Sequence, residues 1–141
     1  MPGQVGGNFV VLDGGVVTHT ANSQKDTYAI NLQIGGNAYV AAGGVIDVMG
    51  KGYTSNVCPW GTSYGGAGGH GSWSGSYQGC YGSVLCPTNC GSTAFKGTTG
   101  AGIVGLACAG SLAVDGQILA NGIDSTGGSG AGGSIRLTAT S

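Results

Sequence analysis

Alternation between apolar and small or polar residues constrains this fold most strongly, and it is clearest between Ile103 and Leu137. There the apolar side chains fall on every second position, at Val104, Leu106, Cys108, Leu112, Val114, Ile118 and Ala120. A period of two is typical of β-strands with one buried face, because successive side chains point to opposite sides of a strand. Gly110, Gly116 and Gly122 interrupt the alternation at regular intervals. The stretch therefore predicts short strands separated by glycine turns.

A similar pattern occurs earlier, between residues 30 and 52. One constant offset, which we call the long offset, places Leu32 on Val104, Ile34 on Leu106, Val40 on Leu112, Gly44 on Gly116, Ile46 on Ile118, Val48 on Ala120 and Gly50 on Gly122. A Gly-rich run follows each copy, at Gly65–Trp73 and Gly127–Leu137. Strands that recur along a chain are typical of solenoids, and a chance alignment of a Gly-, Ala- and Val-rich chain is the alternative. We interpret residues 1–141 as a single all-β domain with repeated strand units at 28–52 and 101–122.

Glycine accounts for 33 of the 141 residues, and the chain has no glutamate. Each glycine inside a helix costs about 1 kcal/mol, so we expect almost no helix. The fold prediction is a parallel β-helix, or β-solenoid, with Gly-rich turns and a Cys-rich inserted loop at residues 53–100. The alternative is an antiparallel β-sandwich or jelly roll of short strands. Stacking of Ile46 beside Ile118 would favour the solenoid.

Charge excludes several classes of function. The chain has only four Lys and Arg residues and a net charge of −1, whereas a nucleic-acid-binding protein needs a basic surface. No apolar run approaches the roughly 18 residues of a membrane span. Asp47 and Asp115 do not align under the long offset, and His70 lies in a Gly-rich stretch without a visible partner residue. No metal or catalytic motif occurs, so the sequence predicts no catalytic, cofactor-binding or metal-binding residues and a protein that is not an enzyme.

The segment 53–100 loses the strand period and concentrates the aromatic residues. Within it, Trp60, Tyr64, Trp73, Tyr77 and Tyr81 are interleaved with Gly and Ser. Such a composition is typical of surfaces that contact sugars or proteins, because aromatic rings offer large area at low entropic cost. Alternatively, the rings form a small core within the insert itself. Both interpretations remain open on the sequence alone.

Four of the five cysteines also lie in the insert, at Cys58, Cys80, Cys86 and Cys90. Their spacing does not resemble a structural zinc site. We expect disulfides among these four, in any of three pairings, and hence an oxidising extracellular setting. Cys108 falls on the buried parity of its strand, which favours a free core thiol over an intermolecular bridge.

The segments QILANG at Gln117–Gly122, GGSGAGGSIRL at Gly127–Leu137 and GGAGGHG at Gly65–Gly71 resemble Gly-rich β-helical surface proteins. The resemblance covers residues 30–137 except the Cys-rich insert, which departs from the simplest members. It implies a right-handed parallel β-helix with an extracellular or cell-surface role that is structural or adhesive. No catalytic residue carries over from it.

The two ends of the chain read as strands without polar caps, which leaves two possibilities: a fragment of a longer protein, or ends that are used in assembly. A strand edge is a template for pairing with another chain, and weak surface charge reduces repulsion between copies. We therefore predict an assembly edge at Phe9, Val11, Ile135 and Leu137. The predicted function is a structural subunit of a self-assembling filament, coat or matrix, with copies of itself as partners. The alternative is an adhesin or carbohydrate-binding module that contacts surface glycans through the aromatic insert, and a polysaccharide-degrading enzyme ranks third.

Overall fold

The structure is a computed structural model that describes residues 1–23, 25–54, 63–64, 80–93, 97–126 and 128–140. These residues form strands and connecting turns and no helix, so the all-β prediction is confirmed. The strands are β1 (Gly3–Val5), β2 (Phe9–Val11), β3 (Val16–Val17), β4 (Ile30–Ile34), β5 (Ala38–Val40), β6 (Val45–Asp47), β7 (Ser63–Tyr64), β8 (Cys80–Tyr81), β9 (Ile103–Cys108), β10 (Leu112–Val114), β11 (Gln117–Leu119) and β12 (Ser134–Ala139). The described residues contain no helix that could span a membrane.

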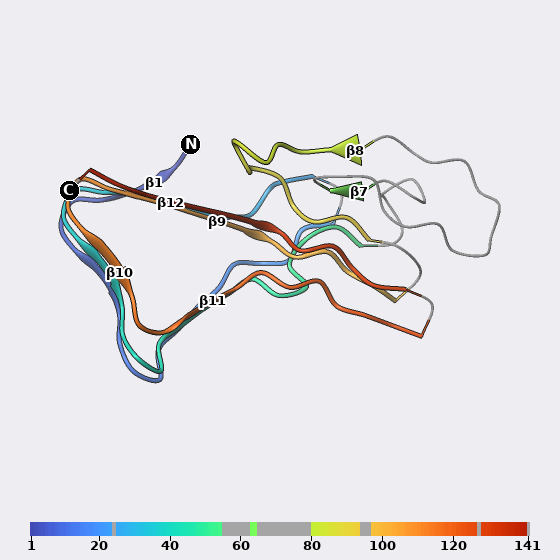
Figure 1. Ribbon diagram of the computed structural model, residues 1–141, viewed down its shortest axis with the longest axis horizontal. Coiled ribbons are helices and arrows are strands. Elements are labelled where there is room, and N and C mark those ends of the chain that lie inside the picture. The colour runs from blue at the N-terminus through green and yellow to red at the C-terminus, as the bar shows by residue number, and fades with distance from the viewer. Residues whose placement is uncertain (24, 55–62, 65–79, 94–96, 127, 141) are drawn as a thin grey trace.

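Three sheets surround the core (Figure 1). Sheet A has the strand order β1-β4-β9-β12, sheet B has β10-β5-β2, and sheet C has β11-β6-β3. A separate pair, β7 and β8, lies at the end of the molecule far from β10. Every pair of described strands runs parallel. The antiparallel alternative is therefore wrong.

The chain passes through sheets A, B and C in the same order three times, and we call each passage a circuit. Circuit 1 contains β1, β2 and β3, circuit 2 contains β4, β5 and β6, and circuit 3 contains β9, β10 and β11; β12 follows in sheet A. Circuits 1 and 2 are in one constant register, in which Gly3 pairs with Leu32, Phe9 with Ala38 and Val16 with Val45. Because strands from successive circuits lie side by side, each sheet grows by one strand per circuit.

The core is built from the alternate side chains of all three sheets. Its fully buried members include Val40 of β5, Ile46 of β6, and Val104 and Leu106 of β9. Ile46 lies between Val17 and Ile118 in sheet C, so the predicted stacking of Ile46 beside Ile118 is confirmed. Burial of such apolar side chains is the main favourable contribution to folding, at about 25 cal/mol for each Å² of apolar surface removed from water.

The long offset seen in the sequence holds in sheet C but not in sheets A and B. Leu32 pairs with Leu106 and Val40 with Val114, in each case two positions beyond the partner that the offset assigns. The cause is the corner between sheets B and C: residues 41–44 connect β5 to β6, whereas Asp115 and Gly116 alone connect β10 to β11. A shift by an even number of positions keeps every side chain on the same face. The sequence pattern therefore identifies the buried positions correctly even where it assigns the wrong partner.

Close backbone packing explains part of the second Gly-rich run. A Cβ atom on Gly130 would lie 1.9 Å from the carbonyl oxygen of Thr99, and one on Gly133 would lie 1.9 Å from that of Gly102. No side chain fits at such distances, so the absence of Cβ lets neighbouring segments meet. The earlier Gly-rich run, at Gly65–Trp73, lies outside the described residues.

The insert between circuits 2 and 3 begins and ends at one place. The backbone N–H of Gly52 donates to the carbonyl oxygen of Gly100 (2.7 Å), and the N–H of Gly100 donates to that of Tyr53 (3.0 Å). Tyr53 also donates its backbone N–H to Gly91 (3.3 Å). These bonds form a neck that joins the two ends of the insert.

Candidate functional site

The outer face of sheet A carries a row of three residues with one gap. Arg136 of β12 and Asn31 of β4 both pair with Gly105 of β9, one on each side. Side chains at equivalent positions of adjacent strands point to the same face. Because Gly105 has no side chain, the row has a hollow there, and the Asn31 carboxamide leans toward it: its Oδ1 would lie 3.2 Å from a Cβ atom on Gly105.

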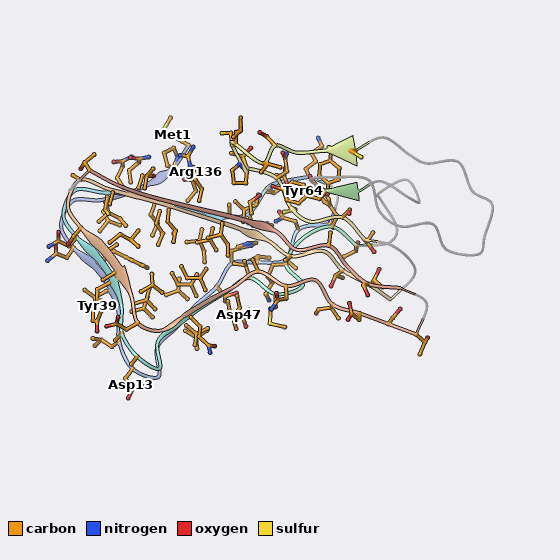
Figure 2. The ribbon with its side chains drawn as sticks, in the orientation of Figure 1. Met1, Asp13, Tyr39, Asp47, Tyr64 and Arg136 are labelled. Atoms are coloured by element: carbon orange, nitrogen blue, oxygen red, sulfur yellow. The ribbon has the colours of Figure 1, made fainter. Side chains whose placement is uncertain are left out.

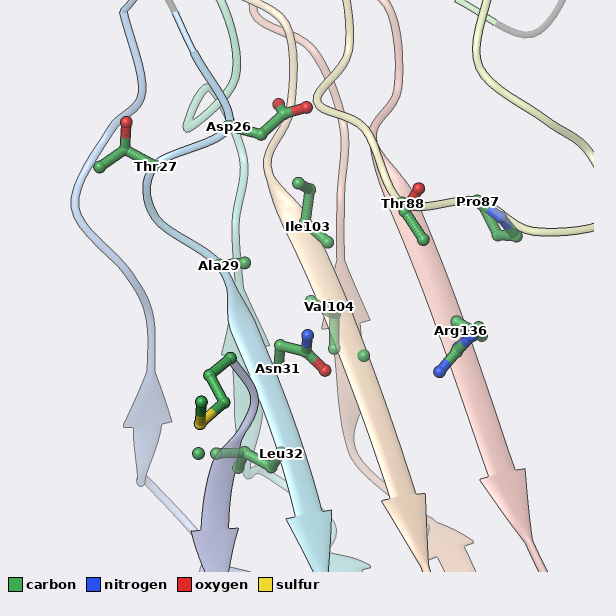
Figure 3. A pocket seen from close by; sticks show the side chains of 13 residues that line it. Asp26, Thr27, Ala29, Asn31, Leu32, Pro87, Thr88, Ile103, Val104 and Arg136 are labelled. Carbon is green, nitrogen blue, oxygen red and sulfur yellow. The ribbon is translucent and has the colours of Figure 1, made fainter.

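This hollow is part of a groove of about 400 Å³, which we call the sheet A groove (Figure 3). The segment containing Pro87 and Thr88 lies along one side of it, beside Arg136. The groove is lined by Met1, Gly3, Asp26, Thr27, Ala29, Asn31, Leu32, Pro87, Thr88, Ile103, Val104, Gly105 and Arg136. Its lining combines apolar side chains with two charged groups, two hydroxyl groups and an amide.

Asp26 lies at one end of the groove and is anchored by the insert. Its Oδ2 accepts a hydrogen bond from Asn89 Nδ2 and its Oδ1 accepts one from the backbone N–H of Cys90, each at 3.0 Å. Partial burial alone would raise the pKa of Asp26, but the hydrogen bonds from Asn89 and Cys90 outweigh it and hold this pKa below its usual value. The carboxylate is therefore ionised at neutral pH.

An Asp with a lowered pKa is poorly suited to general acid catalysis near neutral pH, because such catalysis needs a pKa close to the working pH. Arg136, by contrast, offers a guanidinium on the exposed outer face of β12, with Nη1 3.9 Å from Cys86 Sγ. Guanidinium groups bind carboxylates and other planar anions through paired hydrogen bonds. The groove thus offers a guanidinium, an amide and hydroxyl groups that can form hydrogen bonds with a polar ligand.

The structure places two of the five predicted contact residues, Tyr64 and Tyr81, against the protein itself. Their rings pack at a centroid distance of 5.3 Å, and Tyr53 packs on Tyr81 at 6.2 Å. Tyr64 Oη hydrogen-bonds with Ser134 Oγ, and Tyr81 Oη donates to the carbonyl oxygen of Cys90 (2.7 Å). For these two rings the geometry favours a small core within the insert over an open surface for sugars or proteins. Tyr64 lies among the side chains near β7 in Figure 2. Trp60, Trp73 and Tyr77 lie outside the described residues.

The prediction of disulfides is wrong for the three insert cysteines that the structure describes. Cys80, Cys86 and Cys90 are all free thiols, as is Cys108. Cys90 is fully buried, and its Sγ accepts a hydrogen bond from Asn22 Nδ2 at 3.1 Å, so a packed polar neighbour occupies the place of a bonded sulfur. Although Cys80, Cys86 and Cys90 are close in the sequence, none of their sulfur atoms is bonded to another. Cys58 lies outside the described residues.

The four cysteines that the structure describes therefore lend no support to an oxidising compartment. Cys108 is buried at the end of β9, as its parity predicts. Burial, followed by the hydrogen bond and charge of Asp26, raises the pKa of the Cys90 thiol well above its usual value, although the Asn22 contact opposes the shift. Cys90 is a structural thiol and not a nucleophile, since the thiolate is the reactive form.

The remaining acids discussed above have local structural partners. Asp47 Oδ1 accepts the backbone N–H of Met49 (2.9 Å), and Asp115 Oδ2 accepts the phenol of Tyr39 (2.9 Å). Asp47 ends β6 in sheet C, whereas Asp115 follows β10 of sheet B, so they do not face one bond as a glycosidase pair would. No group of three His, Cys or Asp residues within the described ranges is placed to hold a metal ion. His70 lies outside those ranges.

The four predicted assembly residues lie on two strands at opposite sides of the stack. Phe9 and Val11 belong to β2, the edge strand of sheet B, and Ile135 and Leu137 belong to β12, the edge strand of sheet A. Val11 is 3% exposed, while Ile135 and Leu137 are 40% and 39% exposed. The edge at β12 is therefore the more open apolar surface of the two.

A second, shorter repeat was missed in the sequence. GGNFVVLDGGVV at residues 6–17 aligns with GGNAYVAAGGVI at residues 35–46, and the strand register follows this alignment. The shared Asn occupies the corner before sheet B, where Asn8 Oδ1 accepts the backbone N–H of Asn37.

No family model, curated protein or solved structure shows significant similarity to this chain, so the interpretation of its sites rests on their own geometry.

Proposed function

We propose that the chain is a parallel β-solenoid that serves as a structural subunit and assembles with copies of itself through its strand edges. The constant register between circuits supports a solenoid, because each circuit adds one strand to all three sheets. Close glycine contacts between successive segments support the resemblance to Gly-rich β-helical surface proteins. By that resemblance, the proposed setting is extracellular or at the cell surface.

One observation carries the proposal: the edge strands β10 and β12 leave inward-facing apolar side chains half open. Val114 is 37% exposed and Leu137 is 39% exposed, while their partners one strand inward, Val40 and Leu106, are 1% and 2% exposed. In a solenoid, a further circuit buries such residues. Each Å² of apolar surface removed from water contributes about 25 cal/mol, and the unpaired backbone groups of an edge strand gain partners at the same time.

Charge does not oppose this contact. The only ionisable side chain within β10, β11 and β12 is Arg136, and β1, β2 and β3 contain none. Repulsion between the edge strands themselves is therefore weak, and the acids of the two edges, Asp13 and Asp115, lie in the turns between strands. Contact between the β12 side of one copy and the β1 side of the next is heterologous, and such a contact propagates as a filament unless it closes into a ring.

Sedimentation of the purified chain tests the proposal. Wild-type protein is expected to form large linear polymers, which electron microscopy would show as filaments. Leu137→Asp places a charge among the apolar side chains of the β12 edge and is expected to yield monomers. Val10→Asp is the matched control, because Val10 is 49% exposed on the outer face of edge strand β2. Wild-type protein that stays monomeric at high concentration would rule out assembly.

The sheet A groove favours a second candidate function, the binding of a polar ligand such as an acidic glycan. Arg136, Asn31 and Thr88 offer hydrogen-bonding groups around the gap at Gly105. Glycan-array binding that is lost on Gly105→Leu, which fills the gap, and retained on Gln33→Ala would support this candidate. Loss on Trp60→Ala and Trp73→Ala instead would assign binding to the aromatic insert, and turnover of a bound polysaccharide would favour an enzyme.

A further inference from the structure

The three sheets do not end at the same level, and this has a consequence for how two copies join. Sheet A contains four strands, whereas sheets B and C contain three each. If β2 and β3 of a second copy continue sheets B and C beyond β10 and β11, then β1 of that copy would have to occupy the place where β12 of the first copy already lies. The two strands compete for one position.

We propose that copies of this chain join by strand exchange: β12 of one copy, still paired with β9 of its own copy, takes the place of β1 on β4 of the next copy. The β1 strand of that next copy is displaced. This inference rests on the proposed self-assembly. The alternative, in which β1 stays and pairs with β12, leaves a gap one strand wide in sheets B and C. That gap would keep Leu112, Val114 and Ile118 partly exposed, so the flush arrangement buries more apolar surface.

The register of sheet A makes the exchange possible without any shift along the strand. Leu137 pairs with Leu106, Leu106 pairs with Leu32, and Leu32 pairs with Gly3. Leu137 and Gly3 are thus equivalent positions, and so are Ala139 and Val5. When β12 replaces β1, the alternation of inward and outward side chains is preserved.

The incoming strand is also the better partner for β4. β1 pairs with β4 over three residues, whereas β12 covers the five positions at which β4 pairs with β9. At the inward positions β1 offers Gly3 and Val5, and Met1 before it is fully exposed. β12 instead brings Ile135 and Leu137 over Ile30 and Leu32.

One contact must adjust. A Cβ atom on Gly3 would lie 3.1 Å from Leu32 Cδ2, so the Leu32 side chain leans into the space above Gly3. That atom is the flexible end of a half-buried side chain and can rotate away. The exchange therefore replaces a short strand that contributes one apolar contact with a longer strand that contributes two and covers the same edge.

Disulfide cross-linking between outward-facing positions distinguishes the two ways of joining. Thr138, Ala107, Gln33 and Gln4 form one outward row in this order. In a variant with Cys58, Cys80 and Cys86 changed to Ser, we would combine Thr138→Cys with Gln33→Cys, or Thr138→Cys with Gln4→Cys, and oxidise the assembled protein. Adjacent strands lie about 4.8 Å apart, within the roughly 4.4–6.8 Å between Cα atoms that a disulfide needs.

Exchange predicts intermolecular cross-links for the 138–33 pair. Within one copy these positions are two strands apart, about 9.6 Å, so an intramolecular bond is not expected to form. Polymers that cross-link through the 138–4 pair instead would overturn exchange while supporting assembly. Protein that forms neither polymers nor cross-links would overturn both proposals.

A deletion of residues 1–5 provides a second measurement if a cysteine variant folds poorly. Removing β1 vacates its place on β4, so exchange predicts a shorter lag and faster growth of polymers by light scattering than for the full chain. If β1 instead pairs with β12 in the assembled state, the deletion removes one side of that contact and slows growth. Slower growth would overturn exchange.

Discussion

The side-chain oxygen of Asn8 accepts a hydrogen bond from the backbone N–H of Asn37, at 2.9 Å, across two successive circuits. Asn37 Oδ1 in turn accepts the backbone N–H of Ser111 at 2.9 Å and lies 3.3 Å from Ser111 Oγ. Each of these residues lies one position before a strand of sheet B. The corner of every later circuit is therefore held by a side chain of the circuit before it.

Asn37→Ala is expected to lower the free energy of unfolding by about 1 kcal/mol, because Ser111 loses its side-chain acceptor. Chemical denaturation followed by circular dichroism measures the change. Asn31→Ala is the control, since Asn31 is an exposed amide on the outer face of sheet A, and we expect it to change stability by less than about 0.5 kcal/mol. Equal effects of the two substitutions would contradict a specific role for the corner Asn.

Ile46→Ala is expected to destabilise the protein by about 2–5 kcal/mol, because Ile46 is completely buried between two neighbouring strands. Val10→Ala, on the outer face of β2, is expected to cost less than about 1 kcal/mol. The midpoints of urea unfolding compare them. A small effect at Ile46 would mean that the three sheets do not enclose a common core.

Gly133→Ala is expected to destabilise the protein by about 1–3 kcal/mol or more, since the new methyl group would overlap the carbonyl oxygen of Gly102. Gly7→Ala introduces the same methyl group where nothing lies within 4 Å, and it is expected to be nearly neutral. Thermal unfolding of the two variants is the measurement. Comparable melting temperatures for both would contradict close packing at the second Gly-rich run.

The thiols are expected to differ sharply in reactivity. Cys80 and Cys86 are exposed and should react with a thiol reagent at pH 8 in native protein, while Cys90 and Cys108 should react only after denaturation. The raised pKa of Cys90 gives a second consequence, because its contribution to stability is present below the thiol pKa of the unfolded chain and is lost as the pH rises above it. Mass spectrometry of labelled peptides identifies each site, and rapid native labelling of Cys90 would refute its burial.

Asp26 predicts the opposite pH dependence. The pKa of Asp26 is lower in the folded protein than in the unfolded chain. The carboxylate therefore adds to the free energy of unfolding above its pKa in the unfolded chain, and this contribution is lost as the pH falls through its pKa in the folded protein. Asp26→Asn should therefore be less stable than wild type at pH 7, and the difference should narrow as the pH falls below about 4, the usual pKa of an Asp side chain. Unfolding curves across this range test the sign. A difference that widens in acid would contradict it.

The strand faces could be predicted from the sequence because side-chain parity survives the loss of an even number of positions from a turn. Val40 illustrates the limit: the long offset placed it on Leu112, but it pairs with Val114. The shortened corner at Asp115 and Gly116 causes the difference, and the length of one corner is not visible in strand periodicity. The shorter repeat is visible in the sequence as a GGN motif shared by residues 6–8 and 35–37, and the long offset does not align these two segments.

The insert could not be predicted in the same way, since its contacts join distant positions without a period. Tyr64 reaches Ser134, whose hydroxyl donates to the carbonyl oxygen of Asn89 (2.6 Å). Asn22, in the turn between circuits 1 and 2, holds Cys90. Such contacts depend on where the circuits place each corner, and cysteine count alone suggested bonds that these packed positions do not make.

The neck formed by Gly52, Tyr53 and Gly100 means that the stacked circuits can accommodate inserts of different length and sequence at this point. The chain leaves and re-enters the stacked circuits at this hydrogen-bonded junction, so the register of circuit 3 on circuit 2 does not depend on how many residues lie between. The end of the insert is bound to the circuits as well, through the contacts of Asn89 and Cys90 with Asp26. Lengthening a loop whose ends are already joined costs only about 0.6 kcal/mol per doubling. One scaffold of this kind could display unrelated loops from the same corner, and evolution could change what the surface presents without rebuilding the wall that carries it.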